Sequence, residues 1–234
     1  MSDARTKSIW EMGKYFEQPM ISHLPTAKVI ETTEKAVKYN MAGVYCKDHE
    51  LDLVRSIIKG TDLFAGIGIS FPFGTDGPKI KAYAAEYLFE RGATNLDFVM
   101  NYRALIEGKF DIVEEEVERV RKAAPEAVLK MIIECCFLNR EQIDFACDVA
   151  IKNRIDFIKT STGQNAGPTF AQACQIVDRM HAAGLRCKVA GVKAPRPQNA
   201  MVYLLSGVDR IGSQGCVDII EGIQELRDRG IFGS

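Results

Sequence analysis

A lysine closes one short apolar stretch of this chain. Residues Ile155 to Ile158 have the composition of a buried strand, Lys159 follows where the strand should end, and a loop with the sequence Gly-Gln-Asn-Ala-Gly-Pro comes after Thr162. A lysine in this place is either a strand-end cation that reaches solvent or an amine nucleophile that forms a Schiff base with a carbonyl substrate. The other strands of the chain decide between these interpretations.

Further charged residues occupy equivalent positions in the neighbouring apolar stretches. Side chains alternate along a strand, so an apolar set such as Leu96 and Phe98 packs under the flanking helices and the other set points inward. Burying several charges is costly unless they are paired or functional, so the inward set is either an internal salt-bridge network or an active site. Its position toward the carboxyl ends of the strands favours an active site. The inward residues of four consecutive predicted strands include Asp97, Lys130, Glu134, Lys159, Ser161 and Lys188.

Two lysines and one carboxylate on a single inner face can carry out aldol chemistry without a metal. A second ammonium group and partial burial both lower the pKa of a lysine, and only the neutral amine attacks a carbonyl. Asp97 could then move protons onto and off the carbinolamine, or at the carbon alpha to the iminium. The set of Asp97, Lys159 and Lys188 therefore predicts a class I aldolase, in which one lysine forms the Schiff base and the other lowers its pKa.

Alternating strands and helices must position these residues. The predicted fold is a single (β/α)8 TIM barrel over residues 1–234, with an N-terminal helical extension in the first twenty residues, where Ile9, Met12 and Phe16 have helical spacing. A doubly wound open sheet is the alternative, but Leu24-Pro25-Thr26 is not the Gly-rich phosphate loop that it needs. The expected strands are 20–24, 42–46, 64–70, 95–101, 128–135, 155–160, 186–190 and 210–212, and the expected helices are 26–39, 50–59, 77–91, 110–123, 140–153, 169–183, 198–205 and 217–229.

Composition limits the partners and the compartment. The chain has 234 residues, a net charge of −1 and no long basic run, which argues against a nucleic-acid or anionic-membrane partner. No apolar run is long enough to span a bilayer, and the N-terminus lacks the apolar core of a secretory signal. Seven cysteines, without a CxxC pair, indicate reduced thiols in a cytoplasmic protein. His23, His49 and His181 are scattered, so neither a metal nor another cofactor is expected.

Three segments of the chain carry a family pattern: Asn95 to Leu105, Leu129 to Glu134, and Asp156 to Gly163, which contains the run Lys-Thr-Ser-Thr-Gly. They resemble the deoxyribose-phosphate aldolase family, and the Lys-Thr-Ser-Thr-Gly run is the most specific part of the resemblance. The similarity extends from about Phe64 to Ile223, and Arg210-Ile211-Gly212 resembles the last strand of the family. It implies cleavage of 2-deoxyribose 5-phosphate to acetaldehyde and glyceraldehyde 3-phosphate, with Lys159 as the Schiff-base lysine, Asp97 as the proton-transfer carboxylate and Lys188 as the lysine that tunes it.

The chain departs from the family pattern where the substrate phosphate is expected to bind. Val192 replaces the second glycine of a Gly-Gly pair after the seventh strand, and Gln214 and Gly215 replace a pair of serines after the eighth. Ser22 stands at the expected position of a first-strand Asp. Lys193 and Arg196 are either replacement anion ligands or surface residues of a Pro-rich loop, and His23 is more typical of a structural histidine than of a proton carrier. The expected substrate-binding residues are Ser161, Gly191, Lys193, Gly212, Ser213 and Gln214.

Several functions remain open on the sequence alone. The first is the deoxyribose-phosphate aldolase reaction, and the second is the same Schiff-base chemistry on another sugar, aldehyde or keto acid. A non-catalytic barrel that binds a sugar phosphate is a third, which the presence of Lys159, Lys188 and Asp97 disfavours. A metal-dependent aldolase lacks its histidine cluster, and a flavin or nicotinamide enzyme would not need a lysine pair. Many barrels of this class pair, so a homodimer or higher homo-oligomer, with the N-terminal helix at an interface, is an open alternative.

Overall fold

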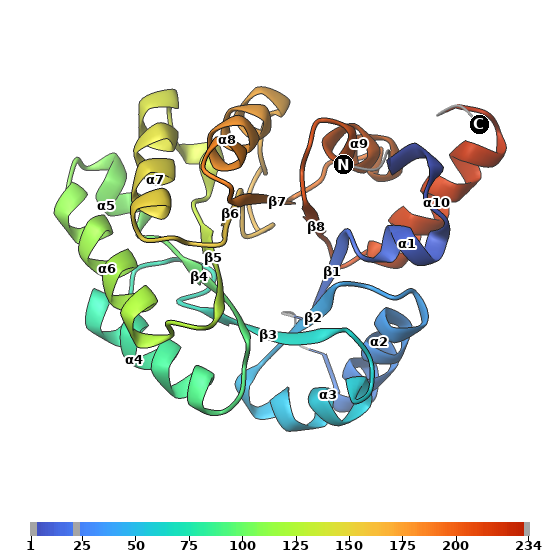
Figure 1. Ribbon diagram of the computed structural model, residues 1–234, viewed down its shortest axis with the longest axis horizontal. Coiled ribbons are helices and arrows are strands. Elements are labelled where there is room, and N and C mark those ends of the chain that lie inside the picture. Colours follow the sequence, from blue (N-terminus) through green and yellow to red (C-terminus); the bar gives the residue numbers. More distant parts are fainter. Residues whose placement is uncertain (1–3, 21–23, 232–234) are drawn as a thin grey trace. The chain divides into compact units, whose positions relative to one another are not determined.

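The computed structural model describes residues 4–20 and 24–231. Its strands follow one another in sequence order in a closed barrel, with helices between them, which confirms the predicted (β/α)8 fold class (Figure 1). The strands are β1 (Phe16–Pro19), β2 (Gly43–Cys46), β3 (Phe64–Ile69), β4 (Asn95–Val99), β5 (Val128–Ile132), β6 (Phe157–Lys159), β7 (Arg186–Ala190) and β8 (Arg210–Gly212).

The helices begin and end largely where the sequence places capping residues. Asn139 and Thr169 each form a capping box, with Gln142 and Gln172 respectively, and Pro78 occupies the first turn of its helix. The helices are α1 (Ile9–Gly13), α2 (Thr26–Lys38), α3 (Leu51–Ile58), α4 (Pro78–Glu90), α5 (Tyr102–Ile106), α6 (Phe110–Ala123), α7 (Arg140–Lys152), α8 (Phe170–Ala182), α9 (Arg196–Leu205) and α10 (Cys216–Asp228), and short 3-10 turns cover Ala4–Thr6, Asp48–Glu50 and Cys135–Phe137.

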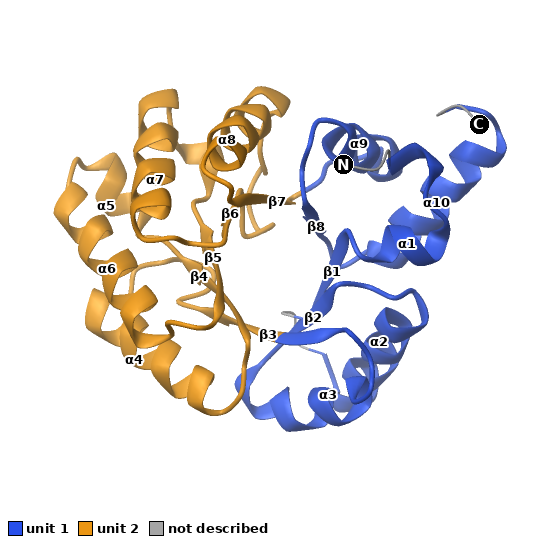
Figure 2. Cartoon of the chain, in the orientation of Figure 1, with its two compact units in different colours: residues 1–65, 192–234 blue, residues 66–191 orange. Residues whose placement is uncertain are grey.

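Contacts divide the chain into two compact units (Figure 2). Unit 2, residues 66–191, contains most of β3, all of β4 to β7 and helices α4 to α8. Its strands are parallel, and every residue of β4 is buried. The helices cover the strands with apolar faces, as α6 does with Val113, Val117 and Val120. The prediction of one domain over the whole chain stays a prediction.

Unit 1 comprises residues up to 65 and from 192 onward. In this unit β1 pairs in parallel with β2 and with β8. Arg227 of α10 donates hydrogen bonds to the carbonyls of Ala4 and Lys7, and so holds the N-terminal segment against the last helix. The segment from Ala4 to Lys7 is therefore attached to α10 through its backbone.

The prediction for the N-terminus was wrong in two respects. The first strand is Phe16–Pro19 and not 20–24, and the helical extension is limited to the single turn Ile9–Gly13 after the 3-10 turn Ala4–Thr6. Phe16 lies at helical spacing from Met12, but its side chain is fully buried on the strand. Of the predicted first strand, residues 21–23 lie outside the described residues, and Met20 and Leu24 have no strand structure. Helix α5 was not predicted.

Candidate active site

Asp97 lies at the centre of a buried cluster of lysines in unit 2. Its Oδ2 atom accepts hydrogen bonds from Lys159 Nζ at 2.9 Å and from Lys188 Nζ at 3.0 Å. Lys130 Nζ is 3.7 Å from the other carboxylate oxygen and donates to Asn95 Oδ1 at 3.0 Å. The structure thus brings together Asp97, Lys159 and Lys188, the three residues proposed from the sequence as the reactive set.

The strand register produces this arrangement. Asp97 stands opposite Lys130 across the β4–β5 pair, and Lys159 stands opposite Lys188 across β6–β7. Residues that stand opposite one another in a sheet point to the same face, so the alternation inferred from the sequence places all four side chains on one side. Ile132 of β5 stands opposite Lys159 of β6. Because Ile132 is two residues after Lys130, it points to the same face as Lys130, so the β4–β5 and β6–β7 pairs share that face.

Burial and charge distinguish the lysines. The side chain of Lys159 is 10% exposed, against 2% for Lys188 and 1% for Lys130, so Lys159 is the most exposed of the three amines. Three ammonium groups around Asp97, all removed from water, repel one another and lose hydration. The carboxylate of Asp97 opposes this repulsion through its hydrogen bonds with Lys159 and Lys188.

Residues after Lys159 bind the end of β6 to its neighbours. The hydroxyl of Ser161 is buried and donates to Thr160 Oγ1 at 3.3 Å, and that oxygen accepts from the amide of Ala190 on β7 at 3.2 Å. The hydroxyl of Thr162 donates to the carboxylate of Glu134. The role of Ser161 in substrate binding stays a prediction, because its hydroxyl has a partner within the protein.

Two glycines meet where the loop after β6 passes the end of β7. A Cβ on Gly167 would lie 2.4 Å from the carbonyl oxygen of Gly191, and a Cβ on Gly191 would lie 2.9 Å from the Cα of Gly167. Both residues have positive φ, +72° and +76°, a conformation that favours glycine. Gly191 was singled out from the sequence, whereas Gly167 was not, although the Gly-Pro step at 167–168 is a sign of a tight loop.

The other predicted binding residues belong to unit 1. Gly212 ends β8, Ser213 follows it with its hydroxyl accepting from the amide of Gly215 at 3.1 Å, and Gln214 is exposed. Lys193 is exposed, and its carbonyl accepts from Asn199 Nδ2 at 3.0 Å. Their assignment to substrate binding stays a prediction.

Arg196 lies beside the start of α10 in the same unit. Its Nη1 atom is 3.1 Å from the position that a Cβ on Gly215 would take. Gly215 is the N-cap residue of α10, and it has no side chain that could accept from the first amides of the helix. The guanidinium of Arg196 therefore lies beside a helix N-terminus that has no N-cap side chain.

Two polar residues of β1 were missed in the sequence. Glu17 and Gln18 are both buried, and Gln18 Nε2 donates to the carbonyl of Gln214 at 3.0 Å, which holds the loop after β8. Glu17 Oε1 is 3.7 Å from Arg210 Nε. Ser22, which the sequence assigned to the first strand, and His23 lie outside the described residues, and the described strand β1 ends at Pro19. A polar pair in a buried strand resembles a loop in the sequence, which is why it was missed.

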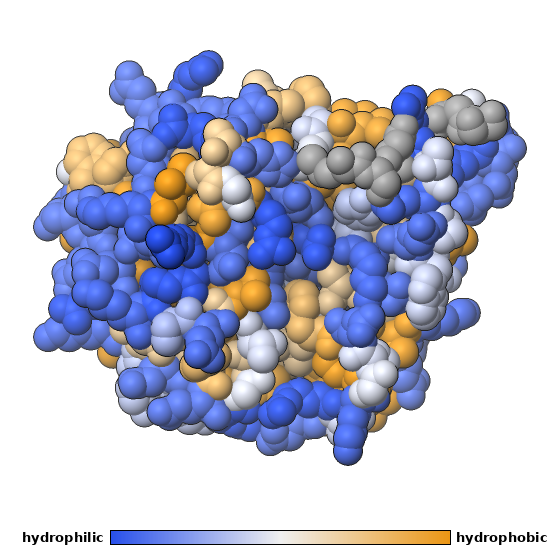
Figure 3. Space-filling view, in the orientation of Figure 1, coloured by the Kyte–Doolittle hydropathy of each residue, from blue (hydrophilic) through white to orange (hydrophobic). Residues whose placement is uncertain are grey.

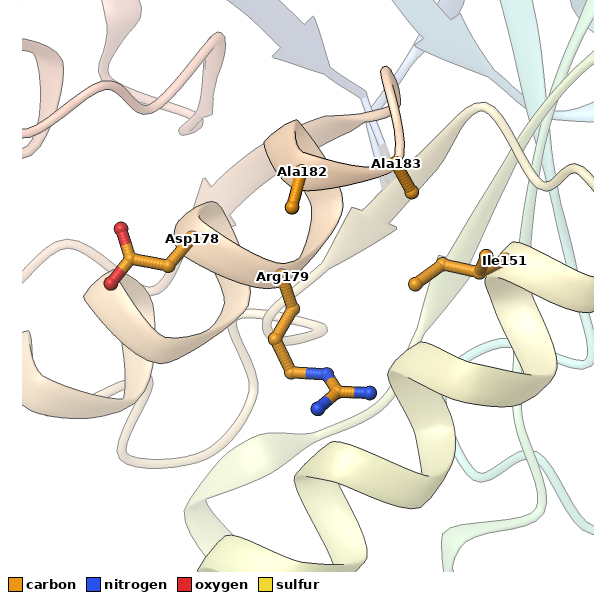
Figure 4. A pocket seen from close by; sticks show the side chains of 5 residues that line it. All are labelled: Ile151, Asp178, Arg179, Ala182 and Ala183. Carbon is orange, nitrogen blue, oxygen red and sulfur yellow. The ribbon is translucent and has the colours of Figure 1, made fainter.

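Other features of the described chain carry no site of comparable chemistry. Arg179 lines a groove between α7 and α8 (Figure 4). Its guanidinium forms ion pairs with Asp144 and Asp148. Burial raises the pKa of the Cys135 and Cys147 thiols to about 12, which makes them poor nucleophiles. Residues 4–20 and 24–231 contain no group of three or more His, Cys, Asp or Glu side chains that could hold a metal ion, and no helix long and apolar enough to cross a membrane.

Comparison with known proteins gives one consistent result. A family profile described as DeoC/LacD family aldolase matches residues 29–214. The deoxyribose-phosphate aldolase of Finegoldia magna is 30% identical over 213 residues, which cover 91% of this chain and 100% of that protein.

Solved structures show the same fold. One solved as QR15, an aldolase, superposes with a TM-score of 0.83 at 27% identity and covers 93% of this chain and 97% of its own. The deoxyribose phosphate aldolase of Aeropyrum pernix, described as a unique tetramer, superposes with a TM-score of 0.83 at 21% identity and covers 94% of this chain and 93% of its own. With the family profile and the sequence relative, these likenesses identify the chain as an aldolase, and thus a lyase, of the DeoC/LacD family.

Proposed function

We propose that this aldolase works through a Schiff base on Lys159 and cleaves 2-deoxyribose 5-phosphate or a related carbonyl compound. The observation that carries the proposal is the contact of two lysine amines with one carboxylate oxygen, at 2.9 Å for Lys159 and 3.0 Å for Lys188. An ion-pair network needs no amine near solvent, whereas Lys159 keeps 10% of its side chain exposed at the end of β6. Family membership supports the same reaction class.

The reaction follows from these groups. The neutral amine of Lys159 adds to the substrate carbonyl, and the carbinolamine loses water to give an iminium. A base removes the proton of the substrate's β-hydroxyl, the bond between the α and β carbons breaks, and the electron pair passes into the iminium to form an enamine. The departing fragment leaves as an aldehyde. The enamine is protonated at carbon, and water hydrolyses the resulting iminium to release the second product and the amine.

Asp97 is the group that we assign to these proton transfers. Its carboxylate touches the amine of Lys159 and is buried, so it can accept a proton from the carbinolamine nitrogen and return one to the departing hydroxyl. Lys188 donates to the same oxygen and keeps Asp97 ionised when Lys159 has lost its proton. The three residues therefore act as a unit, and substitutions at them are not expected to be additive.

Replacing Lys188 with leucine is expected to move the acid limb of the pH–rate profile to higher pH. The ammonium of Lys188 disfavours a second positive charge on Lys159, so its removal makes the neutral amine less available at a given pH. A shift of one pH unit corresponds to about 1.4 kcal/mol. The profile of kcat/KM against pH measures it, with Lys79→Leu as an exposed-lysine control on α4. An unchanged profile in Lys188→Leu would refute this role.

The identity of the substrate depends on the anion-binding segments. Phosphate in (β/α)8 enzymes is commonly bound by backbone amides after the seventh and eighth strands. In this chain Val192 has a Cβ where a glycine would leave the backbone open, and it is buried. At the eighth strand the hydroxyl of Ser213 already accepts from the amide of Gly215. Arg196 and Lys193 offer cations in the same segments, and their charge favours a carboxylate or a phosphate held with a different geometry.

We therefore expect weak activity on 2-deoxyribose 5-phosphate, with kcat/KM below about 10⁴ M⁻¹s⁻¹. Gln214 and Gly215 remove the two hydroxyl donors of the expected serine pair, and each hydrogen bond from such a donor to a charged group is worth roughly 1.5–3 kcal/mol. A variant with Val192→Gly, Gln214→Ser and Gly215→Ser should be more active. The serine at 215 requires Arg196 to move by a few tenths of an ångström, which its flexible end allows.

The test compares phosphorylated and unphosphorylated 2-deoxyribose together with keto acids, each assayed for cleavage and for borohydride-trapped adduct by intact mass. Unmodified enzyme with kcat/KM above about 10⁴ M⁻¹s⁻¹ on the phosphate would overturn the expectation of an altered anion site. Failure of every carbonyl compound to leave a reducible adduct would overturn the Schiff-base proposal itself.

We also propose a cytoplasmic homo-oligomer. Reduced cysteines support the compartment, since all seven are free thiols. The tetrameric relative from Aeropyrum pernix supports self-association. Hydrophobic residues lie in separate patches on the face that Figure 3 shows, and α4 exposes Ile80, Tyr83 and Tyr87 along one side, at 61%, 67% and 42%. Such a row on a helix is suited to burial against another surface.

A further inference from the structure

Glu134 occupies an irregular position at the end of β5. In the regular register Ile132 stands opposite Lys159, and the amide of Ile133 donates to the carbonyl of Lys159 at 3.0 Å. The next amide of the ladder, that of Cys135, donates to Thr160 at 2.9 Å, although a regular parallel ladder would advance two residues on both strands. Two residues on β5 therefore match one on β6, which is a β-bulge with Glu134 as the extra residue.

The backbone of Glu134 is left-handed, with φ 47° and ψ 54°. This conformation is uncommon for a residue other than glycine and persists where the surrounding structure fixes it, often near functional sites. At a bulge the side chain leaves the regular alternation and is redirected. The sequence pattern placed Glu134 on the inner face, but it could not show the bulge.

The redirected carboxylate binds one residue of β6's extension. Glu134 is fully buried, and its Oε1 and Oε2 atoms accept from the amide of Thr162 at 3.4 and 3.3 Å. Oε2 also accepts from the hydroxyl of the same residue. Both groups of Thr162 act as donors, so the side chain at 134 must present acceptors to each of them. A carboxylate satisfies this requirement with charged acceptors, whereas a carboxamide keeps one neutral acceptor oxygen, and hydrogen bonds to a neutral acceptor are weaker.

Thr162 in turn fixes the loop that follows it. Its hydroxyl oxygen accepts from the amide of Gln164 at 3.1 Å. The loop then continues to Gly167, which packs against Gly191 at the end of β7. Hydrogen bonds thus connect Glu134 to Thr162 and Thr162 to Gln164, at the start of the loop that leaves the strand of Lys159.

We propose that Glu134 is a positioning residue for Lys159, acting through Thr162. This inference rests on the proposed function of Lys159 as the Schiff-base amine. The carbonyls of Lys159 and Thr160 are held by the amides on either side of Glu134, and Thr162 is held by its carboxylate. The residues around the bulge therefore hold the main chain at Lys159, Thr160 and Thr162. Loss of the carboxylate removes the contacts at Thr162 and allows the end of β6, which carries the amine, to shift.

The size of the effect follows from the geometry of addition. Displacement of a reacting group by about 1 Å can lower a rate about 100-fold. Glu134→Gln is expected to lower the rate constant of adduct formation at Lys159 by about 10- to 100-fold, with a smaller change in the half-saturating carbonyl concentration. Thr162→Val loses the hydroxyl, so its rate constant of adduct formation should also be lower. Thr162→Ser keeps the hydroxyl, and its rate constant should remain within about threefold of that of the unmodified enzyme.

The experiment uses the full chain and acetaldehyde as the probe. Adduct at Lys159 is reduced with borohydride at a series of times and measured by intact mass and peptide mapping, and thermal unfolding is recorded for each variant. Glu115→Gln, an exposed glutamate of α6, is the matched control. The double variant Glu134→Gln/Thr162→Val should be about as slow as Glu134→Gln alone, because both substitutions interrupt one interaction.

The outcomes separate the two proposals. If the unmodified enzyme gives no adduct with acetaldehyde or any other carbonyl compound, the proposed function fails. If it gives the adduct and folded Glu134→Gln forms it at the same rate, the positioning role is refuted while the proposed function stands. If Glu134→Gln does not fold, the Thr162 pair decides: a slow valine variant with a fast serine variant supports the role, and equal rates overturn it.

Discussion

Replacing Lys159 with alanine should abolish the borohydride-trapped adduct and lower aldol cleavage by about 10⁴-fold or more. Removal of a nucleophile that acts as one unit with its neighbours has effects of this order or larger in other covalent enzymes. The expectation follows from the structure, because Lys159 is the most exposed amine of the cluster and donates to the carboxylate of Asp97 at 2.9 Å. Lys188 and Lys130 are too deeply buried to replace it.

The measurement is peptide mapping after reduction, together with a steady-state cleavage assay. The adduct mass should be located on Lys159 in the unmodified protein and be absent from Lys159→Ala. Lys79→Ala, which removes an exposed lysine of α4, serves as the control for charge and labelling. A label on Lys188, or undiminished cleavage by Lys159→Ala, would contradict the assignment of the nucleophile.

The contact of Asp97 with Lys159 and Lys188 could be predicted because it depends on a simple rule. Alternation along each strand places Asp97, Lys159 and Lys188 on the same face, and charged residues in otherwise apolar strands are conspicuous in a sequence. The register then brings their side chains into contact without any further requirement. The last two strands were predicted at the bounds that the structure has, 186–190 and 210–212.

The first strand could not be found in this way. Phe16 fits a helical face with Ile9 and Met12, and Glu17-Gln18 resembles a polar turn. In the structure these polar residues are buried, where Gln18 donates to the carbonyl of Gln214 and Glu17 lies near Arg210. Their partners are about two hundred positions away in the chain, so no local pattern indicates that the polar groups are satisfied.

Helix periodicity also conceals a buried ion pair in unit 2. Charged residues of amphipathic helices are normally assigned to the solvent face, yet Lys81 of α4 and Glu116 of α6 have side chains with no exposed surface, and Nζ is 2.6 Å from Oε2. Lys81 also donates to the carbonyls of Gly74 and Val99, each at 2.8 Å. Glu116 accepts from the amide of Asn101 at 2.7 Å. The pair therefore holds α4, α6 and the end of the strand that carries Asp97.

Burial raises the pKa of Glu116 to about 7 and lowers that of Lys81, while the partner charge opposes each shift. The sign for Glu116 follows from linkage: a carboxyl whose folded pKa lies above its unfolded value of about 4.5 contributes stability below pH 4.5. That contribution is lost as the pH rises through about 7. The cation of Lys81 limits this loss, because it pairs with the ionised form.

Replacing Lys81 with methionine should therefore lower the free energy of unfolding by about 3–5 kcal/mol at neutral pH, because the carboxylate of Glu116 is left buried without its cation. Without that cation the folded pKa of Glu116 rises further, so the loss should be greater at pH 8 than at pH 5. Urea denaturation at both pH values measures this dependence. The double variant Lys81→Met/Glu116→Leu removes both charges and should recover part of the loss. If Lys81→Met is equally destabilised at pH 5 and pH 8, or the double variant is less stable than Lys81→Met, then the pair does not act through the charge of Glu116.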